Sequence, residues 1–332
     1  MKKKISKKTG ILLFYIAALI MACLIVFHKN PNARAAEENL KKIISVVVIL
    51  VSCVLFTALY DKVTGLPVEL YQNRHLIWKL AKNDFKKRYA GSYLGAVWAM
   101  VQPVITVVMY WLVFDVIMGS AGMAMRGGSD IPFVLFLTAG LVPWFYFNEA
   151  WTNGTMALLE YNYLVKKVVF KISILPIIKV IGATFVHVFF VCILLLIAAF
   201  YGYTPTLYTL QIFYYSFCLF VLMLAMSYST CAIVVFFRDL SQMINIGLQV
   251  GMWATPILWN IGMLDNYPNL KILFKLNPLT YIVNGYRSAI YEESWFFEHF
   301  YSSTYFWIFT VTLFCVGALI FKRLKVHFAD VL

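Results

Sequence analysis

Few residues of this chain have the types and the spacing that catalysis requires. The ionisable side chains expected inside apolar stretches are Asp115, Glu149 and His187. A charge at mid-bilayer costs roughly 2.5–3.5 kcal/mol on insertion scales, so such residues are functional candidates by default. They form no chain of carboxylates of the kind that a proton-coupled transporter needs. We expect His187, which lies between two valines, to be a neutral histidine hydrogen-bonded within the helices.

Acidic residues near the end of the chain have no recognisable catalytic spacing. They are Asp265, Glu292, Glu293 and Glu298, with His299 beside them. A membrane-embedded enzyme would need a clustered acid, base or nucleophile at one membrane face. The chain also contains no GxxxxGK[ST] sequence, so a pump would need ATP to be bound by a separate chain. The six cysteines lie in apolar runs without paired spacing, and we expect neither a disulfide nor a metal site.

A basic segment, residues 74–88, has a clearer pattern. A helix here places Ile77, Trp78, Leu80, Ala81 and Phe85 on one side. Lysines fall on the other side. Such a helix typically lies in the plane of a membrane surface, with its apolar side in lipid and its lysines toward the headgroups. Alternatively, the charged run merely flanks a spanning helix. After this segment, Gly91 and Gly95 would allow the chain to turn sharply into the bilayer.

The composition restricts the class of protein. Of the 332 residues, 62% are hydrophobic and only 13% are charged, and the mean hydropathy is +0.79. A soluble domain is near half apolar and a quarter charged, so this is a polytopic membrane protein without room for a large soluble domain. The net charge is +13. Because the lysines cluster beside apolar stretches, lipid and topology account for them, and we expect no nucleic-acid partner.

The apolar windows predict an all-α protein with eight membrane crossings. The windows are 11–27, 43–60, 92–118, 132–155, 172–200, 208–237, 241–260 and 303–321. Helix breakers and aromatic residues fill 253–298, which we expect to dip into the membrane from the outer side without crossing it. Most of the 28 lysines and arginines fall on one side when both termini are cytoplasmic, and we therefore expect this orientation.

The crossings predict three parts. Residues 1–62 form an N-terminal transmembrane hairpin, whose first helix reads as a retained signal anchor. Residues 63–90 contain a linker with Gly65 and Pro67 and then the amphipathic interfacial helix. Residues 91–332 form a six-span body.

Four stretches carry a resemblance to a known family. RYAGSYLGAVWAMVQPVI begins at Arg88, YNYLVKKVVFKISILPI occupies 161–177, FFRDL occupies 236–240 and NPLTYIVNGYR occupies 277–287. In order and spacing, they resemble the permease subunits of bacterial ABC transporters that export O-antigen, capsule or teichoic acid (the type 2 export permeases). The resemblance covers about 70–332. It implies an export permease core of six spans in a bacterial plasma membrane, and it says nothing of the first hairpin.

The resemblance implies contacts with a separate ATPase subunit. In the family, the cytoplasmic segment between the second and third core spans docks in a groove of the ATPase. Here that segment holds Tyr163, Leu164, Lys166 and Lys167, whose apolar members suit a groove and whose lysines suit acidic rims. From spacing alone, the segment is simply a positive-inside anchor. Arg238 and Asp239 close the fourth core span: Asp239 and Gln242 fit a helix-start capping pair, and a second ATPase contact is the alternative.

Aromatic residues make up 17% of the chain. Their flat faces suit the C–H faces of sugars, although aromatic belts also occur in any membrane protein. In the family, the first and fifth core spans face the centre of a dimer. The residues expected along a translocation path are therefore Trp98, Tyr110, Trp253 and Trp259.

The leading hypothesis is the transmembrane subunit of an ATP-driven exporter. Two copies of the chain and two ATPase subunits, which would hold ATP and Mg²⁺, would move a polyprenyl-linked polysaccharide or teichoic acid outward. The chain itself is expected to hold no cofactor and to have no catalytic residue. A basic set either meets the diphosphate of the substrate or holds anionic membrane lipids, and it consists of Lys79, Lys82, Lys86, Lys87 and Arg88. The alternatives are a membrane-embedded glycan polymerase or acyltransferase, and an exporter of drugs or lipids.

Overall fold

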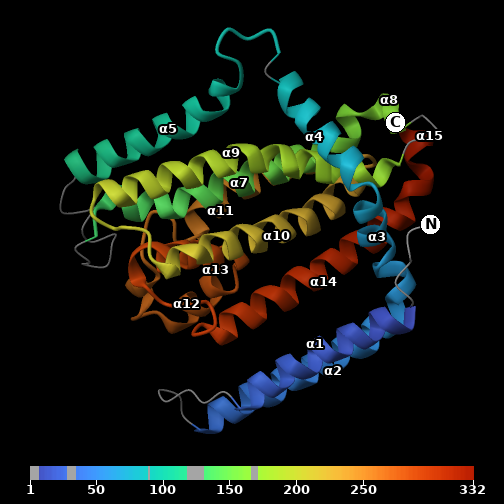
Figure 1. The fold of residues 1–332 in the computed structure, drawn as a ribbon, viewed down its shortest axis with the longest axis horizontal. Helices are drawn as coiled ribbons and strands as arrows, with labels where there is room; N and C mark the ends of the chain where they lie inside the picture. The colour runs from blue at the N-terminus through green and yellow to red at the C-terminus, as the bar shows by residue number, and fades with distance from the viewer. Residues whose placement is uncertain (1–6, 28–34, 89, 118–130, 166–170) are drawn as a thin grey trace. The chain divides into compact units, whose positions relative to one another are not determined.

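The computed structural model describes residues 7–27, 35–88, 90–117, 131–165 and 171–332. Within these ranges the regular elements are helices, and no strand occurs (Figure 1). The chain divides into two compact units, Met1–Tyr71 and Gln72–Leu332, which are described separately below.

The first unit is a pair of helices, α1 (Lys7–Phe27) and α2 (Ala35–Val63), which pack against each other. The rings of Phe14 and Phe56 stack with centroids 4.0 Å apart, and the hydroxyls of Tyr15 and Thr57 lie 2.6 Å apart. Apolar side chains cover the outer sides of both helices as well. A helix that is apolar all round suits lipid rather than water. A short helix, α3 (Gly65–Gln72), follows.

Four long helices form the core of the second unit. They are α7 (Phe133–Glu160), α9 (Leu175–Phe200), α10 (Gln211–Val234) and α14 (Phe300–Leu324). Helix α7 packs on α9 and α10, and α10 packs on α14 (Figure 1). Small residues allow close approach at these contacts, as is typical of helices packed in membranes. Gly154 of α7 lies against Ser227 of α10, and Gly317 of α14 lies against Ser229 of α10.

Five helical segments are long and apolar enough to cross a membrane. They are Lys7–Phe27, Phe133–Glu160, Ile172–Phe200, Leu207–Val234 and Phe300–His327. Two shorter apolar segments, Lys42–Ala58 and Trp98–Phe114, correspond to two more of the eight predicted crossings. The remaining window, 241–260, differs from a simple span. Helix α11 (Leu240–Ala254) has only 15 residues, because the chain leaves helical geometry at Thr255, just before Pro256.

The segment after α11 is built from short helices. They are a 3₁₀ turn (Ile261–Leu264), α12 (Pro268–Lys275), α13 (Pro278–Arg287) and a π-helical turn (Ser288–Glu292). Each of these helices has ten residues or fewer, which is too short to cross a bilayer. Helix α13 is nonetheless buried against α7 and α10. The Asn277 side chain caps the N-terminus of α13, where it accepts a hydrogen bond from the Leu279 amide at 3.0 Å.

Two helices at the beginning of the second unit complete it. Helix α4 (Arg74–Arg88) packs on α9, and α5 (Trp98–Trp111) packs on α7 and continues into a π-helical turn (Leu112–Ile117). Gly91 and Gly95, at φ +84° and +55°, form the turn between them as predicted. The helical, polytopic fold class is confirmed.

One expectation for α4 needs correction. Ile77 and Ala81 were expected to face lipid, but both are buried. Trp78 and Phe85 contact Phe185 of α9 edge to face, with ring centroids 5.5 and 5.4 Å apart. The apolar side of α4 therefore packs largely on protein.

Candidate functional site: a buried charge network

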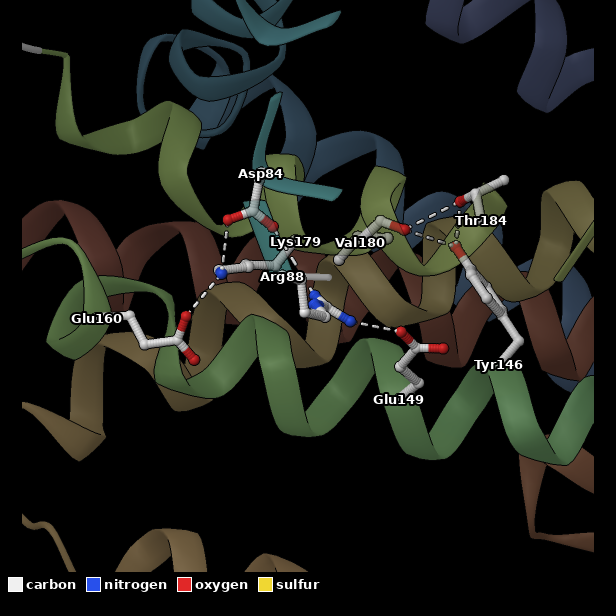
Figure 2. A network of polar contacts seen from close by, with 8 residues as sticks. All are labelled: Asp84, Arg88, Tyr146, Glu149, Glu160, Lys179, Val180 and Thr184. Atoms are coloured by element: carbon white, nitrogen blue, oxygen red, sulfur yellow. Dashed lines mark hydrogen bonds and ion pairs between the residues drawn. The ribbon is translucent and has the colours of Figure 1, made fainter. Parts of the chain in front are cut away.

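A carboxylate and a lysine, both buried, join α4 to α9. Asp84 lies on the same side of α4 as Ile77 and Ala81, and its carboxylate accepts a hydrogen bond from Lys179 Nζ at 2.9 Å (Figure 2). The side chains of Lys179 and Asp84 are only 5% and 8% exposed. A charge removed from water in this way is costly unless it is paired, so this pair fixes α4 against α9.

The same lysine reaches the end of α7. Lys179 Nζ lies 2.6 Å from Glu160 Oε2, on the last residue of that helix. The next residue, Tyr161, donates its hydroxyl to Asp84, and Lys179 Nζ lies 4.9 Å from the centroid of its ring. Burial, and then the Asp84 carboxylate, raise the pKa of Tyr161, so the hydroxyl stays protonated and acts as a donor.

A second ion pair joins the end of α4 to the middle of α7. Arg88 Nη1 lies 2.7 Å from Glu149 Oε1, and Arg88 Nη2 lies 3.8 Å from Asp84 Oδ2 (Figure 2). Nearby, the hydroxyls of Tyr146 and Thr184 lie 3.0 Å apart and add a contact between α7 and α9. Five charged side chains from three helices thus form one connected set, named here the charge network: Asp84, Arg88, Glu149, Glu160 and Lys179.

The predicted basic set is divided by this arrangement. Lys79, Lys82, Lys86 and Lys87 are exposed on α4. Arg88 instead belongs to the charge network and is only 25% exposed. The four lysines are therefore available to an anionic surface, whereas Arg88 holds helices together.

The predicted coupling residues that the structure describes lie on two short turns. Helix α8 (Asn162–Val165) directly follows Tyr161, and on it Tyr163 is 53% exposed while Leu164 is half-buried. Lys166 and Lys167 lie outside the described residues. Arg238 and Asp239 are exposed in the turn between α10 and α11.

The expected capping pair at the start of α11 is wrong. Asp239 is the N-cap residue, but its side chain makes no capping hydrogen bond. Its backbone carbonyl accepts from the amides of Gln242 and Met243 instead. The φ and ψ of Asp239, −66° and −15°, are helical, whereas a capping side chain needs an extended residue at this position.

Of the predicted path residues, Trp98 and Tyr110 lie on α5, Trp253 lies on α11, and Trp259 follows the end of α11. Trp98 and Trp253 are 52% and 61% exposed. The Tyr110 hydroxyl lies 4.0 Å from Met252 Sδ, which places α5 beside α11. Trp259 donates its Nε1 hydrogen to the Trp253 carbonyl at 3.1 Å. Helix α5 has no buried residue and α11 has only Ile244 and Leu248, so both present apolar surface outward.

Sequence reasoning found Glu149 but missed Asp84, Glu160 and Lys179. The signal for Lys179 was present, because this lysine lies in the apolar run ILPIIKVIGATF and needs a partner there. The signal for Asp84 was its place on the stripe of Ile77 and Ala81. His187 was predicted correctly: its Nε2 lies 2.9 Å from the Tyr286 hydroxyl and 3.2 Å from Ser216 Oγ.

Five helical segments long and apolar enough to cross a membrane are typical of a multi-pass membrane protein. Residues 75–291 match the ABC-2 type transporter family, and the chain belongs to that family. The O-antigen export system permease protein RfbA of Myxococcus xanthus is 29% identical over 226 residues, which cover 68% of this chain and 84% of that protein. The protein of the same name from Klebsiella pneumoniae is 28% identical over 264 residues, 77% of this chain and 95% of that protein.

Family membership supports a permease subunit rather than an embedded enzyme, and it implies an ATPase partner. Two of the acidic residues near the end of the chain, and His299 beside them, have polar partners close by in the sequence. Asp265 pairs with Lys271, Glu292 accepts from Ser288 Oγ at 2.9 Å and His299 Nε2 lies 3.1 Å from Ser294 Oγ. Across the ranges that the structure describes, no group of three or more His, Cys, Asp or Glu residues could hold a metal ion.

Proposed function

We propose that the chain is the transmembrane subunit of an ATP-driven exporter of a cell-surface polysaccharide. Two copies would form a central path, and two ATPase subunits would hold ATP and Mg²⁺. The polymer, a polysaccharide or teichoic acid on a polyprenyl diphosphate, would move from the cytoplasmic to the outer face. The two RfbA relatives are named as permeases of O-antigen export, which supports a glycan over a drug or a lipid.

One observation carries the mechanism. Tyr161 bonds to Asp84 in the charge network, and the exposed Tyr163 follows two residues later on α8. An ATPase subunit that moves α8 would therefore also move Asp84, and with it α4 and α9. Exposed aromatic residues at a turn are typical anchors of protein interfaces. Lys166, Lys167, Arg238 and Asp239 would add polar contacts at the rim of this interface.

The path would run along α5 and α11. Their outward apolar surfaces include Trp98 and Trp253, and Tyr110 connects the two helices near Met252. A second copy would cover these surfaces from the other side of a two-fold axis. Aromatic faces let a sugar chain slide because they contact its C–H groups without holding each hydroxyl.

The proposed orientation determines which residues would meet the substrate on the cytoplasmic side. With both termini in the cytoplasm, the charge network and α8 lie at the inner face. The lysines Lys79, Lys82, Lys86 and Lys87 would then lie at the inner headgroups. There they would attract either anionic lipids or the diphosphate of the substrate.

The first test is co-purification of the full-length tagged chain from native membranes, followed by an ATPase assay. We expect a second protein with a P-loop, and ATPase activity that falls when Tyr163→Ala is combined with Lys167→Glu. A matched control is Tyr267→Ala, because Tyr267 is 60% exposed but lies at the start of α12. A chain that purifies without any ATPase would contradict the proposal, and so would an equal loss in the control.

A further inference from the structure

A polar cavity lies among the short helices that follow α11. It has a volume of about 310 Å³ and is lined by residues of α10, α12, α13 and α14 and of the turns beside them. This is the lower end of the range of small-molecule sites, roughly 300–1,000 Å³. Lys275, His299 and Ser302 on its wall are exposed, whereas Arg287 is buried. The cavity therefore runs from the surface to a buried floor.

The floor holds a charge that its neighbours leave partly unsatisfied. Arg287 is 2% exposed, its Nη2 donates to the Ile257 carbonyl at 2.8 Å, and its Cζ lies 3.7 Å from the centroid of the Phe136 ring. Its Nε has no hydrogen-bond acceptor among the described residues. A buried guanidinium with a hydrogen that lacks an acceptor is costly, and an anion in the adjoining cavity would offset part of that cost through its charge.

The wall adds further positive charge. Lys271 and Lys275 of α12 line the cavity together with Arg287, and the one carboxylate on the lining is Glu292. Lys271 also pairs with Asp265, which is not part of the lining. Positive groups outnumber negative ones even when Asp265 is included, so the cavity favours an anion.

Tyrosine rings form another part of the wall. Tyr215, Tyr281 and Tyr305 all line the cavity, and the Tyr305 hydroxyl donates to the Leu276 carbonyl at 2.7 Å, which fixes that ring. Flat rings of this kind pack against the apolar face of a sugar. Basic and aromatic groups in one small cavity select a ligand with both a sugar ring and a negative charge.

We propose that this cavity binds one acidic sugar unit, that is, a monosaccharide residue that carries a carboxylate or a phosphate. Arg287 and Lys275 would attract the acidic group, and Tyr305, the least buried of the three tyrosines, would pack against the ring. The inference rests on the proposed function for the source of that sugar, the exported polymer, but binding itself requires neither ATP nor transport.

The cavity lies far from the charge network. Helix α14 begins next to α12 and α13 (Figure 1), and His299, Ser302 and Tyr305 at that end line the cavity. At the other end of α14, Lys325 Nζ contacts Ser173 Oγ at 3.1 Å, just before α9. The 25 residues of α14 span about 37 Å at 1.5 Å per residue. In the proposed orientation, the cavity is therefore at the outer face, where it would meet the polymer as the polymer emerges.

The test measures ligand binding to the full-length chain in phosphatidylcholine nanodiscs by saturation-transfer NMR. The probes are glucuronate, glucose 1-phosphate, glucose and inorganic phosphate. We expect the two acidic sugars to bind more tightly than either glucose or phosphate, and to bind more weakly as salt rises. Lys275→Gln should weaken binding roughly three- to tenfold, as expected for one charge removed near the ligand. Glu292→Gln should strengthen it by a similar factor, and Lys322→Gln, an exposed lysine at the other end of α14, should leave it unchanged.

The opposite shifts in Lys275→Gln and Glu292→Gln separate binding from folding damage, because general destabilisation weakens binding in both. Glucose that binds as well as glucuronate would overturn the proposal, and so would equal behaviour of the three variants. Inorganic phosphate that binds as well as glucose 1-phosphate would overturn the role of the sugar ring. Loss of binding when phosphatidylglycerol replaces phosphatidylcholine would show that a lipid headgroup is the occupant instead. None of these results depends on an ATPase partner, so they are distinguishable from failure of the proposed function.

Discussion

Lys179→Met removes the cation at the centre of the charge network. Lys179 is 5% exposed and lies within 2.9 Å of oxygens of both Asp84 and Glu160. Loss of one partner of a buried ion pair typically costs about 3–5 kcal/mol. Asp84 would keep its contacts with Tyr161 and Arg88, and the carboxylate of Glu160, which is 47% exposed, would be solvated by water. Both effects reduce the cost of losing the lysine. We therefore expect a loss of about 2–4 kcal/mol in the free energy of unfolding.

The assay is thermal unfolding of the full-length chain in nanodiscs. At roughly 2–4 °C per kcal/mol for a domain of this size, the Tm should fall by about 5–15 °C. Lys322→Met is the matched control, since Lys322 is an exposed lysine of α14, and its Tm should stay close to that of the parent chain. A Tm of Lys179→Met equal to that of Lys322→Met would refute the reasoning.

A double substitution separates stability from coupling. Asp84→Leu with Lys179→Met removes both charges and leaves apolar side chains, which is often neutral or stabilising in other buried pairs. The double variant should therefore recover part of the Tm lost in Lys179→Met. It should remain poor in ATP-driven export, because Tyr161 would no longer have its acceptor on α4.

Three further predictions concern single positions. Tyr163→Ala should change the free energy of unfolding by less than about 0.5 kcal/mol, because Tyr163 is exposed, but it should lower ATPase co-purification. Gly285→Ala would place a methyl group on the Tyr215 ring and should destabilise by about 1–3 kcal/mol, which thermal unfolding would detect. Gly91→Ala, at φ +84° in open space, should cost about 1–2 kcal/mol from backbone strain alone. Gly65→Ala, also in open space but without positive φ, should cost less than Gly91→Ala in the same measurement.

Local patterns predicted the elements well where one chain segment determines them. The helix at 74–88 has the predicted bounds, because the alternation of lysines and apolar residues is a property of that segment alone. The turn at Gly91 and Gly95 follows from the conformational freedom of glycine. In the window at 241–260, hydropathy alone does not reveal the helix end, but Pro256 and the helix breakers after it indicate that this segment is not a simple span.

The charge network could not be predicted from the sequence, because its members are far apart along the chain. Asp84 and Lys179 are separated by 95 positions, and neither residue alone shows that the other neutralises it. Asp84 was assigned to neither side of the helix, although its helical position places it with Ile77 and Ala81. Helices α4 and α9 are likewise far apart in the sequence, so the sequence indicated lipid beside α4 where the structure has protein.

The central claim is that movement at α8 drives export of a glycan through the bundle. The most direct measurement is ATP-dependent uptake of a lipid-linked glycan by proteoliposomes that contain the chain and its co-purified ATPase. We predict uptake that requires ATP hydrolysis and that Tyr163→Ala reduces without loss of folded protein. Uptake without ATP, or uptake unchanged in Tyr163→Ala, would contradict the account.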